Sequence, residues 1–284
     1  MRFGITLGQL NPTHWVEVAV EADRLGFESV WLPEHLVFPV EVRGQLVAGE
    51  EHPPVPPNVP VFDACAYLSY LAARTEHLRL GTFVYLLGLR HPFVSARGFA
   101  TLDIVSGGRA EVGVGAGWLT TEWTAAGLDP GTRGRRLDEA MVVCRRLWTE
   151  EVIEHHGEFF DFDPVMFEPK PVQRPHPPLL VGGESERALR RAARLGDGWI
   201  GMHHTPGSVA AQVAKLRAFE QEAERRDGDR PCGVTAMGAV EADSDVDRWA
   251  EAGVDRLIVV PWRRSRDALD GLRRFADLIG LPSV

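Results

Sequence analysis

The sequence predicts an α/β protein, a single (β/α)8 barrel spanning residues 1–284, and three observations support this fold class. Eight short apolar stretches alternate with helical patterns, the order typical of parallel strands joined by helical crossovers. The first strand–helix–strand unit, over 2–32, has tight connections that favour parallel pairing. A chain of 284 residues is also commonly one barrel. An open doubly wound sheet is the alternative architecture.

The first elements follow from turn and capping residues. Thr13 is expected to cap a helix over 14–26, whose apolar face recurs at helical spacing and which Gly26 ends. A later helix begins at Arg90-His91-Pro92 and stops at Ser106-Gly107-Gly108, because glycine takes the left-handed conformation that ends helices. In that helix Phe99, Leu102 and Val105 are spaced for one buried face.

The remaining elements follow from apolar runs and periodicity. The expected strands are 2–7, 28–32, 78–87, 109–114, 178–181, 197–201, 233–239 and 256–260. The expected helices after the first are 62–74, 90–106, 133–148, 186–195, 208–226, 245–252 and 265–279.

Two segments do not follow this alternation of strands and helices. Residues 33–61 carry seven prolines and leave from a strand end, which favours a lid or rim loop. Residues 150–177 are predicted to be an insertion, because they lack a helical period and are compatible with a hairpin.

Composition excludes several classes of partner. The formal net charge is −9, the isoelectric point is near 5.6, and no basic run stands out, so neither nucleic acid nor a membrane is expected as a partner. No apolar run is long enough to cross a bilayer and no leader is evident, so a cytoplasmic protein is expected. The cysteines Cys65, Cys144 and Cys232 are odd in number and far apart, which indicates reduced thiols.

Functional side chains of a barrel follow its strands, because the carboxyl ends of the strands meet at one mouth. The residues that follow the expected strands are Gly8, Gln9, Pro33, Glu34, His35, Thr82, Phe83, Val84, His91, Gly115, Gly117, Trp118, Thr121, Gly182, Gly183, Glu184, Ser185, Met202, His203, His204, Pro261 and Trp262.

Two glycine-rich stretches among them suit a ligand. Gly113, Gly115 and Gly117 leave bare backbone that a flat or anionic ligand can approach, although they do not form the dinucleotide fingerprint. The run 182–185 joins a strand end to a helix N-terminus, which suits a phosphate; the alternative is that Ser185 only caps the helix. With no nucleophile–base pair and no carboxylate pair in view, the pattern favours an enzyme whose cofactor does the chemistry.

Other interpretations remain open at these positions. His35 is either a functional residue or a plain loop histidine, and His91 before Pro92 is favoured as a helix-start residue. Glu34 and His35 with Asp63, Glu122 and His203 contain metal-ligand chemistry, but no ligand spacing supports a site, so no metal is expected.

The chain resembles the bacterial luciferase-like monooxygenase superfamily, and within it the coenzyme F420-dependent oxidoreductases of actinobacterial type. The stretches that carry the resemblance are WLPEHLVFP (31–39), LRLGTFVYLLGLRHP (78–92), ATLDIVSGGRAEVGVGAGW (100–118), GRRLDEA (134–140), FEPKPVQRPHPPLLVGG (167–183) and ALRRAARLGDGWIG (188–201). They cover most of the chain up to about residue 201, and beyond it only the strand–helix rhythm is similar.

The resemblance implies a luciferase-like barrel, often dimeric, that binds F420 or FMN at its mouth. It implies that His35 is catalytic, and that Phe83-Val84 is a non-proline cis peptide behind the cofactor ring. The residues implied to bind the cofactor are Glu34, Thr82, Phe83, Val84, Gly115, Gly117, Trp118, Thr121, Gly182, Gly183, Glu184 and Ser185. The implied partners are a small-molecule substrate and a second copy of the chain.

One departure bears on the substrate. Trp118 stands where sugar-phosphate dehydrogenases of this family carry a proton-donating glutamate, which disfavours a sugar phosphate and favours an apolar pocket. The leading hypothesis is therefore F420-dependent hydride transfer to or from a small organic substrate. The alternatives are an FMN-dependent monooxygenase supplied by a separate reductase, and a non-catalytic flavin-binding protein.

Overall fold

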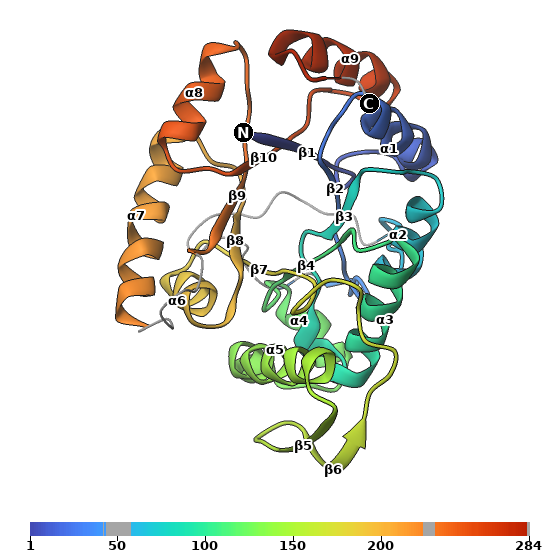
Figure 1. Ribbon diagram of the computed structural model, residues 1–284, viewed down its shortest axis with the longest axis vertical. Coiled ribbons are helices and arrows are strands. Elements are labelled where there is room, and N and C mark those ends of the chain that lie inside the picture. Colours follow the sequence, from blue (N-terminus) through green and yellow to red (C-terminus); the bar gives the residue numbers. More distant parts are fainter. Residues whose placement is uncertain (42, 44–57, 224–230, 283–284) are drawn as a thin grey trace.

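The computed structural model describes residues 1–41, 43, 58–223 and 231–282, and its centre is a closed barrel of eight parallel strands (Figure 1). Around the barrel the strands run in the order β1-β2-β3-β4-β7-β8-β9-β10, and β10 pairs with β1. The (β/α)8 prediction is confirmed. The barrel strands are β1 (Arg2–Thr6), β2 (Ser29–Leu32), β3 (Arg79–Thr82), β4 (Ala110–Val114), β7 (Leu179–Gly182), β8 (Gly198–Gly201), β9 (Gly233–Met237) and β10 (Arg256–Val259).

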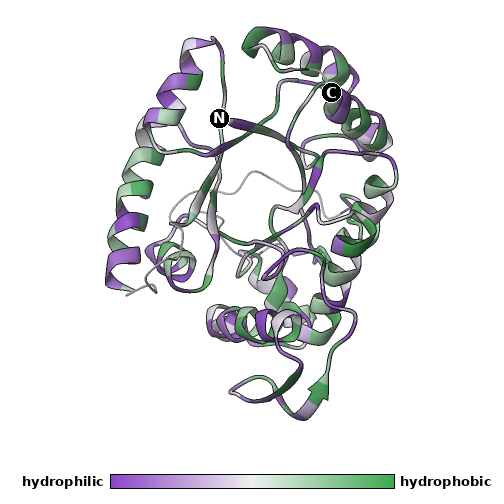
Figure 2. Ribbon diagram, viewed as in Figure 1, coloured by the Kyte–Doolittle hydropathy of each residue, from purple (hydrophilic) through white to green (hydrophobic). Residues whose placement is uncertain are grey.

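The helices lie around the barrel and, for one short helix, at its mouth (Figure 1). They are α1 (Trp15–Arg24), α2 (Ala64–Ala72), α3 (Pro92–Val105), α4 (Thr120–Ala125), α5 (Arg133–Thr149), α6 (Glu186–Leu195), α7 (Pro206–Glu222), α8 (Ser244–Glu251) and α9 (Ala268–Ile279). Most helices show both green and purple in Figure 2, as expected when apolar side chains face the strands and polar ones face solvent. No helix within the described residues is long and apolar enough to span a membrane.

Several local predictions were wrong, each for an identifiable reason. The third strand ends at Thr82 rather than at 87, because the following apolar residues pack at the barrel mouth and include a 3-10 turn at Leu87–Leu89. Asn11, not Thr13, caps the first helical turn, since its side chain accepts the N–H of Thr13. Val105 is more than half exposed, and the face of α3 is completed instead by small residues and the buried Asp103.

Two hydrophobic clusters organise the interior. The larger one lies between the strands and the surrounding helices and includes Phe99 and Leu102. The smaller one draws on strands and strand ends alone, so it fills the lumen, and its buried members are Trp31, Phe83, Leu180, Ile200, Met237 and Ile258. The indole of Trp31 occupies this space because Gly4 and Gly81 have no Cβ: a methyl group on either would overlap its ring.

The amino-terminal end of the lumen is closed by buried charges. Arg256 donates to both carboxylate oxygens of Glu28 (2.7 and 2.6 Å) and to Glu111 (3.1 and 2.9 Å), and Arg79 also pairs with Glu111. Burial raises the pKa of Glu111, but Arg256 and Arg79 lower it further, so the net direction is down and the carboxylate stays ionised. The cluster therefore seals the end of the barrel opposite the mouth.

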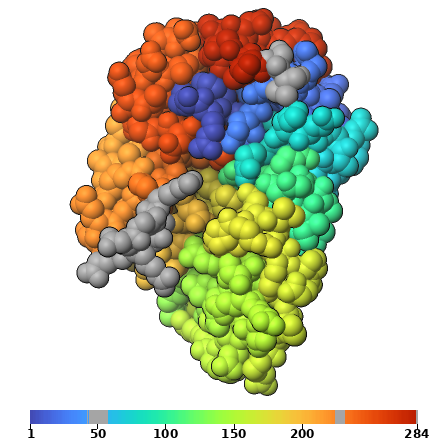
Figure 3. All heavy atoms as spheres, viewed as in Figure 1, coloured from blue at the N-terminus to red at the C-terminus, as the bar shows by residue number. Residues whose placement is uncertain are grey.

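Strands β5 (Val152–His156) and β6 (Asp161–Met166) form an antiparallel hairpin outside the barrel, within the predicted insertion. In Figure 3 this part of the chain forms one end of the molecule. Glu139 on α5 holds the hairpin, because its carboxylate accepts the backbone N–H groups of Phe159 and Phe160 and contacts Nε2 of His155 at 3.1 Å. Of the predicted lid, residues 42 and 44–57 lie outside the described residues, so its role stays a prediction.

Substitution of Gly81 tests the lumen packing. Gly81→Ala should destabilise the protein by about 1–3 kcal/mol, because the added methyl group has to displace the fully buried Trp31 ring. The free energy of unfolding in urea gives the measurement. Gly207→Ala is the matched control: Gly207 lies in the first turn of α7 with no atom within 4 Å of a built Cβ, so this variant should be neutral or slightly stabilised. Equal effects of the two substitutions would contradict this account of the lumen.

Candidate functional site

The sequence-predicted residues lie just beyond the carboxyl ends of β2, β3, β4 and β7, at the mouth of the barrel. His35 follows β2, and its Nδ1 lies 2.8 Å from Oε2 of Glu122 on α4. The other oxygen of Glu122 accepts the backbone N–H groups of Leu36 (2.5 Å) and Val37 (3.2 Å). The Glu122 side chain is buried and that of His35 is 16% exposed, so the imidazole is held firmly and still reaches solvent.

Glu34 forms a buried ion pair, and its contact with a cofactor stays a prediction. Its carboxylate accepts the N–H of Leu86 at 2.9 Å and pairs with the Arg90 guanidinium at 2.5 Å, and it is fully buried. Burial lowers the pKa of Arg90, yet Glu34 raises it further, so the guanidinium stays charged beside the carboxylate. Glu34 therefore joins the end of β2 to the segment after β3, and its carboxylate is occupied by that pairing.

Val84 forms a platform between two strand ends. A Cβ on Gly182 would lie 2.6 Å from Cγ1 of Val84, and a Cβ on Gly115 would overlap Cγ2. The peptide bond between Phe83 and Val84 is cis, as the resemblance implies. Thr82, by contrast, is buried and donates its hydroxyl to the carbonyl of Gly113, which is a contact between strands. Because glycine stands on both sides of Val84, its partly buried apolar side chain packs between the two strand ends at the mouth.

The loop from Gly182 to Ser185 leads into α6. Gly183 has φ of +125°, a conformation that favours glycine. Ser185 caps α6 by accepting the N–H of Ala188, as the simpler alternative stated. Within the described part of the chain, the N–H groups of Glu186 and Arg187 have no acceptor. The helix N-terminus thus keeps two open donors and its positive dipole end, so capping and anion binding are compatible.

The carboxylate of Glu184 is turned to the neighbouring strand end. It accepts the N–H of Met202 at 2.7 Å and lies 2.9 Å from Nε2 of His204. If a ligand binds at the 182–185 loop, Glu184 can therefore contact it only through its backbone. His203, the other histidine of this pair, has φ of +57° and is exposed.

Aromatic side chains surround His35. The ring of Phe38 lies 4.4 Å from the imidazole between centroids, and Trp118 lies 6.0 Å away, edge to face. Gly117, with φ of +76°, lies against the indole of Trp123. The hydroxyl of Thr121 accepts the N–H of Arg43 at 3.3 Å, so it contacts the chain that follows β2. The surroundings of His35 combine one carboxylate with apolar rings.

The remaining predicted positions do not join this group. His91 caps α3 by accepting the N–H of Phe93, which confirms the helix-start interpretation. Trp262 is buried in the large core beside α9. Among the residues that the structure describes, no group of three or more His, Cys, Asp or Glu side chains has the arrangement of a metal site. Burial raises the pKa of Cys65 to about 12, so this thiol is a poor nucleophile near neutral pH.

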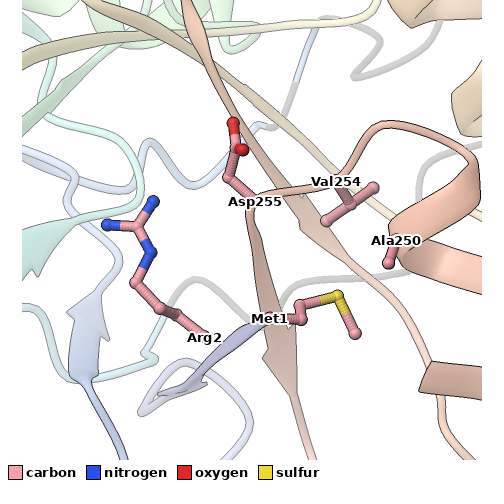
Figure 4. Close-up of a pocket in the computed structure, with 5 residues that line it drawn as sticks. All are labelled: Met1, Arg2, Ala250, Val254 and Asp255. Carbon is pink, nitrogen blue, oxygen red and sulfur yellow. The ribbon is translucent and has the colours of Figure 1, made fainter. Parts of the chain in front are cut away.

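A cavity of about 380 Å³ lies elsewhere on the molecule (Figure 4). It is lined by Met1, Arg2, Ala250, Val254 and Asp255, which belong to the start of β1, the end of α8 and the turn before β10. These residues lie at the amino-terminal ends of the strands, opposite the mouth. None of the sequence-predicted site residues lines this cavity.

Sequence reasoning missed three side chains that shape the mouth. Glu122 was considered only as a metal ligand, and the short helix α4 that carries it was not predicted at all. Arg90 was assigned to a helix start, and Phe38 to the lid. The sequence carries one signal for Glu122, which is the acidic residue in Thr-Thr-Glu-Trp directly after the glycine loop.

Removal of Glu34 tests whether its role is the ion pair. Glu34→Ala should lower the free energy of unfolding by about 3–5 kcal/mol, because it leaves the largely buried Arg90 without its counter-charge. The double variant Glu34→Leu/Arg90→Met should regain much of this loss in urea unfolding. A double variant less stable than Glu34→Ala would contradict the assignment.

The chain is similar to known proteins over most of its length. Residues 1–277 match the model of the luciferase-like monooxygenase family. Over 259 residues, 90% of both chains, the sequence is 36% identical to a protein of Mycobacterium tuberculosis. It is 34% identical over 196 residues to the F420-dependent glucose-6-phosphate dehydrogenase of Kineococcus radiotolerans, covering 68% of this chain and 53% of that one.

Two further proteins are similar to this chain. The FMNH2-dependent dimethylsulfone monooxygenase of Pseudomonas putida is 35% identical over 151 residues, 52% of this chain and 41% of that one. An F420-dependent secondary alcohol dehydrogenase, solved with an F420–acetone adduct, has the same fold with a TM-score of 0.79 at 20% identity, covering 99% and 98% of the two chains. The chain belongs to the luciferase-like monooxygenase family and is an oxidoreductase.

Proposed function

We propose that the protein is a coenzyme F420-dependent oxidoreductase that moves a hydride between the deazaflavin and a small organic substrate at the barrel mouth. The observation that carries the proposal is the platform of Val84 between Gly115 and Gly182, beside a helix N-terminus with open donors. A flat ring needs such an apolar support, and a phosphate needs such donors.

The residues present fit a flavin-type cofactor. Val84 would support the ring, and a side chain on Gly115 or Gly182 would fill the space that Val84 now occupies. The backbone of Gly183 and the first turn of α6 would hold the phosphate. The bound deazaflavin would supply the carbon that accepts or returns the hydride.

The chain itself would handle the proton and the substrate. His35 would take or return a proton, since an imidazole held at a site mouth is a common general acid or base. Trp118 and Phe38 border it with apolar rings, which suits an uncharged substrate better than a sugar phosphate. Across the described residues, no lysine stands at the mouth: Lys170 binds the carbonyls of Leu147 and Glu150 at the end of α5.

FMN is the second candidate cofactor. The Val84 side chain and the 182–185 loop suit both F420 and FMN, and the relatives include an FMNH2-dependent monooxygenase. F420 is favoured by the greater share of this chain that matches the F420-dependent sugar-phosphate dehydrogenase. A homodimer and a cytoplasmic location remain parts of the proposal, and sedimentation of the purified protein would test the first.

Cofactor titration tests the proposal. The purified protein should quench or shift the fluorescence of F420 at micromolar concentration and bind FMN more weakly. Gly182→Ala should weaken binding of F420 by about tenfold or more, because its Cβ displaces Val84 and one contact of this kind costs about 1–3 kcal/mol. Gly207→Ala, whose added methyl group meets no atom within 4 Å, should bind as the wild type does. Tight binding of FMN alone would overturn the choice of F420.

Replacement of His35 tests its role in proton transfer. His35→Ala should reduce kcat by about 10²–10⁴-fold, the usual contribution of a general acid or base, with a small change in cofactor affinity. Turnover with a panel of alcohols and ketones, alongside the fluorescence titration, gives both quantities. Normal turnover combined with a large loss of affinity would show that His35 binds the cofactor instead.

A further inference from the structure

The two carboxylate oxygens of Glu122 have different hydrogen-bond partners. Oε1 accepts two backbone N–H groups, from Leu36 and Val37, whereas Oε2 contacts Nδ1 of His35 alone among the described residues, at 2.8 Å. An ionised carboxylate is an acceptor at both oxygens, so the ring nitrogen that faces it has to carry a proton. In the neutral imidazole the proton therefore lies on Nδ1, and Nε2 keeps its lone pair.

The second nitrogen is left available. Within the described residues Nε2 of His35 makes no hydrogen bond, and the side chain is partly exposed among Phe38 and Trp118. The same carboxylate also fixes the backbone directly after His35, so ring orientation and backbone position depend on one group. This arrangement holds the acceptor atom of His35 toward whatever occupies the mouth.

We infer that Glu122 is the positioning residue that sets the tautomer of His35, so that Nε2 acts as the proton acceptor. The inference rests on the proposed function for its catalytic consequence, but not for the tautomer. A substrate O–H or N–H bond breaks, its electron pair stays on the substrate, and the proton binds Nε2. The Glu122 carboxylate then faces the imidazolium and stabilises its charge. A substrate bearing an ionisable hydroxyl or amine at the reacting carbon follows from this role.

The variant Glu122→Gln is expected to change the tautomer of His35, because glutamine has only one carbonyl oxygen. Keeping both backbone hydrogen bonds requires that oxygen at the Oε1 position, which turns the amide NH2 toward His35. Nδ1 then has to accept, and the proton moves to Nε2. The opposite orientation leaves two backbone donors, Leu36 and Val37, facing an NH2 group, which costs more hydrogen bonds.

The chain offers a matched control in Glu139. This carboxylate also accepts two backbone N–H groups, from Phe159 and Phe160, and contacts one histidine, His155. It lies at the β5–β6 hairpin, outside the barrel mouth. Glu139→Gln therefore disturbs an equivalent local network without touching His35.

The experiment is nitrogen-15 NMR of histidine-labelled protein without cofactor, with the His35 signals assigned by their loss in His35→Asn. We expect the proton on Nδ1 in the wild type and in Glu139→Gln, and on Nε2 in Glu122→Gln. Glu122→Asp, which keeps the charge, should retain the wild-type tautomer even if it lowers stability. A wild-type ring protonated on Nε2, or an unchanged tautomer in a folded Glu122→Gln, would overturn the inference.

Turnover separates this inference from the proposed function. Glu122→Gln should lower kcat by about 10²-fold or more with little change in the affinity for F420, while Glu139→Gln should keep both. A changed tautomer with unchanged kcat would refute the catalytic role of His35 and leave the tautomer assignment standing. Absence of F420 binding in the wild type would refute the proposed cofactor, and the NMR result would still decide the role of Glu122.

Discussion

The structure depends on closure of eight parallel strands around a lumen that Trp31 fills. The indole fits because Gly4 and Gly81 on neighbouring strands lack side chains, and the buried pairs of Arg256 and Glu111 seal the amino-terminal end. Closure brings the carboxyl ends of all eight strands to one mouth, so residues distant in sequence become neighbours. The chemistry of the protein has to be assembled from those strand ends.

Three carboxylates hold the mouth together in the same way. Each pairs with a cationic or titratable side chain and also accepts a backbone N–H from a neighbouring segment: Glu34 with Arg90 and Leu86, Glu122 with His35 and Leu36, and Glu184 with His204 and Met202. Together they join β2 to β3, α4 to β2, and β7 to β8. Of the three, Glu122 is the one that contacts the imidazole of His35, the proposed proton acceptor. Loops fixed in this way give a preorganised pocket without long secondary structure.

Much of the fold was predictable from the sequence, because periodicity and glycine stops report local structure. The helix over Arg133–Thr149 and the helix over Glu186–Leu195 appear close to their predicted bounds. The glycines after β4 and β7 were found because bare backbone at a strand end is visible in the sequence. The cis peptide at Phe83-Val84 came from the resemblance alone.

The pairings at the mouth were not predictable, because they join residues through the closed barrel. Glu122 and His35 are 87 positions apart, and Glu34 and Arg90 are 56 apart. Helix α4 has only six residues, too few for a periodic signal. For Glu34 the family resemblance implied a cofactor contact but gave no sign of the ion pair that its carboxylate makes with Arg90.

We propose that a flat phosphorylated cofactor binds across the mouth, from Val84 to the start of α6. Amide hydrogen exchange with and without F420 measures this directly. The account predicts slower exchange at Gly115–Gly117 and at the first-turn amides Glu186 and Arg187, with no change in the β5–β6 hairpin. Slower exchange confined to the opposite end of the barrel, near Met1 and Asp255, would contradict it.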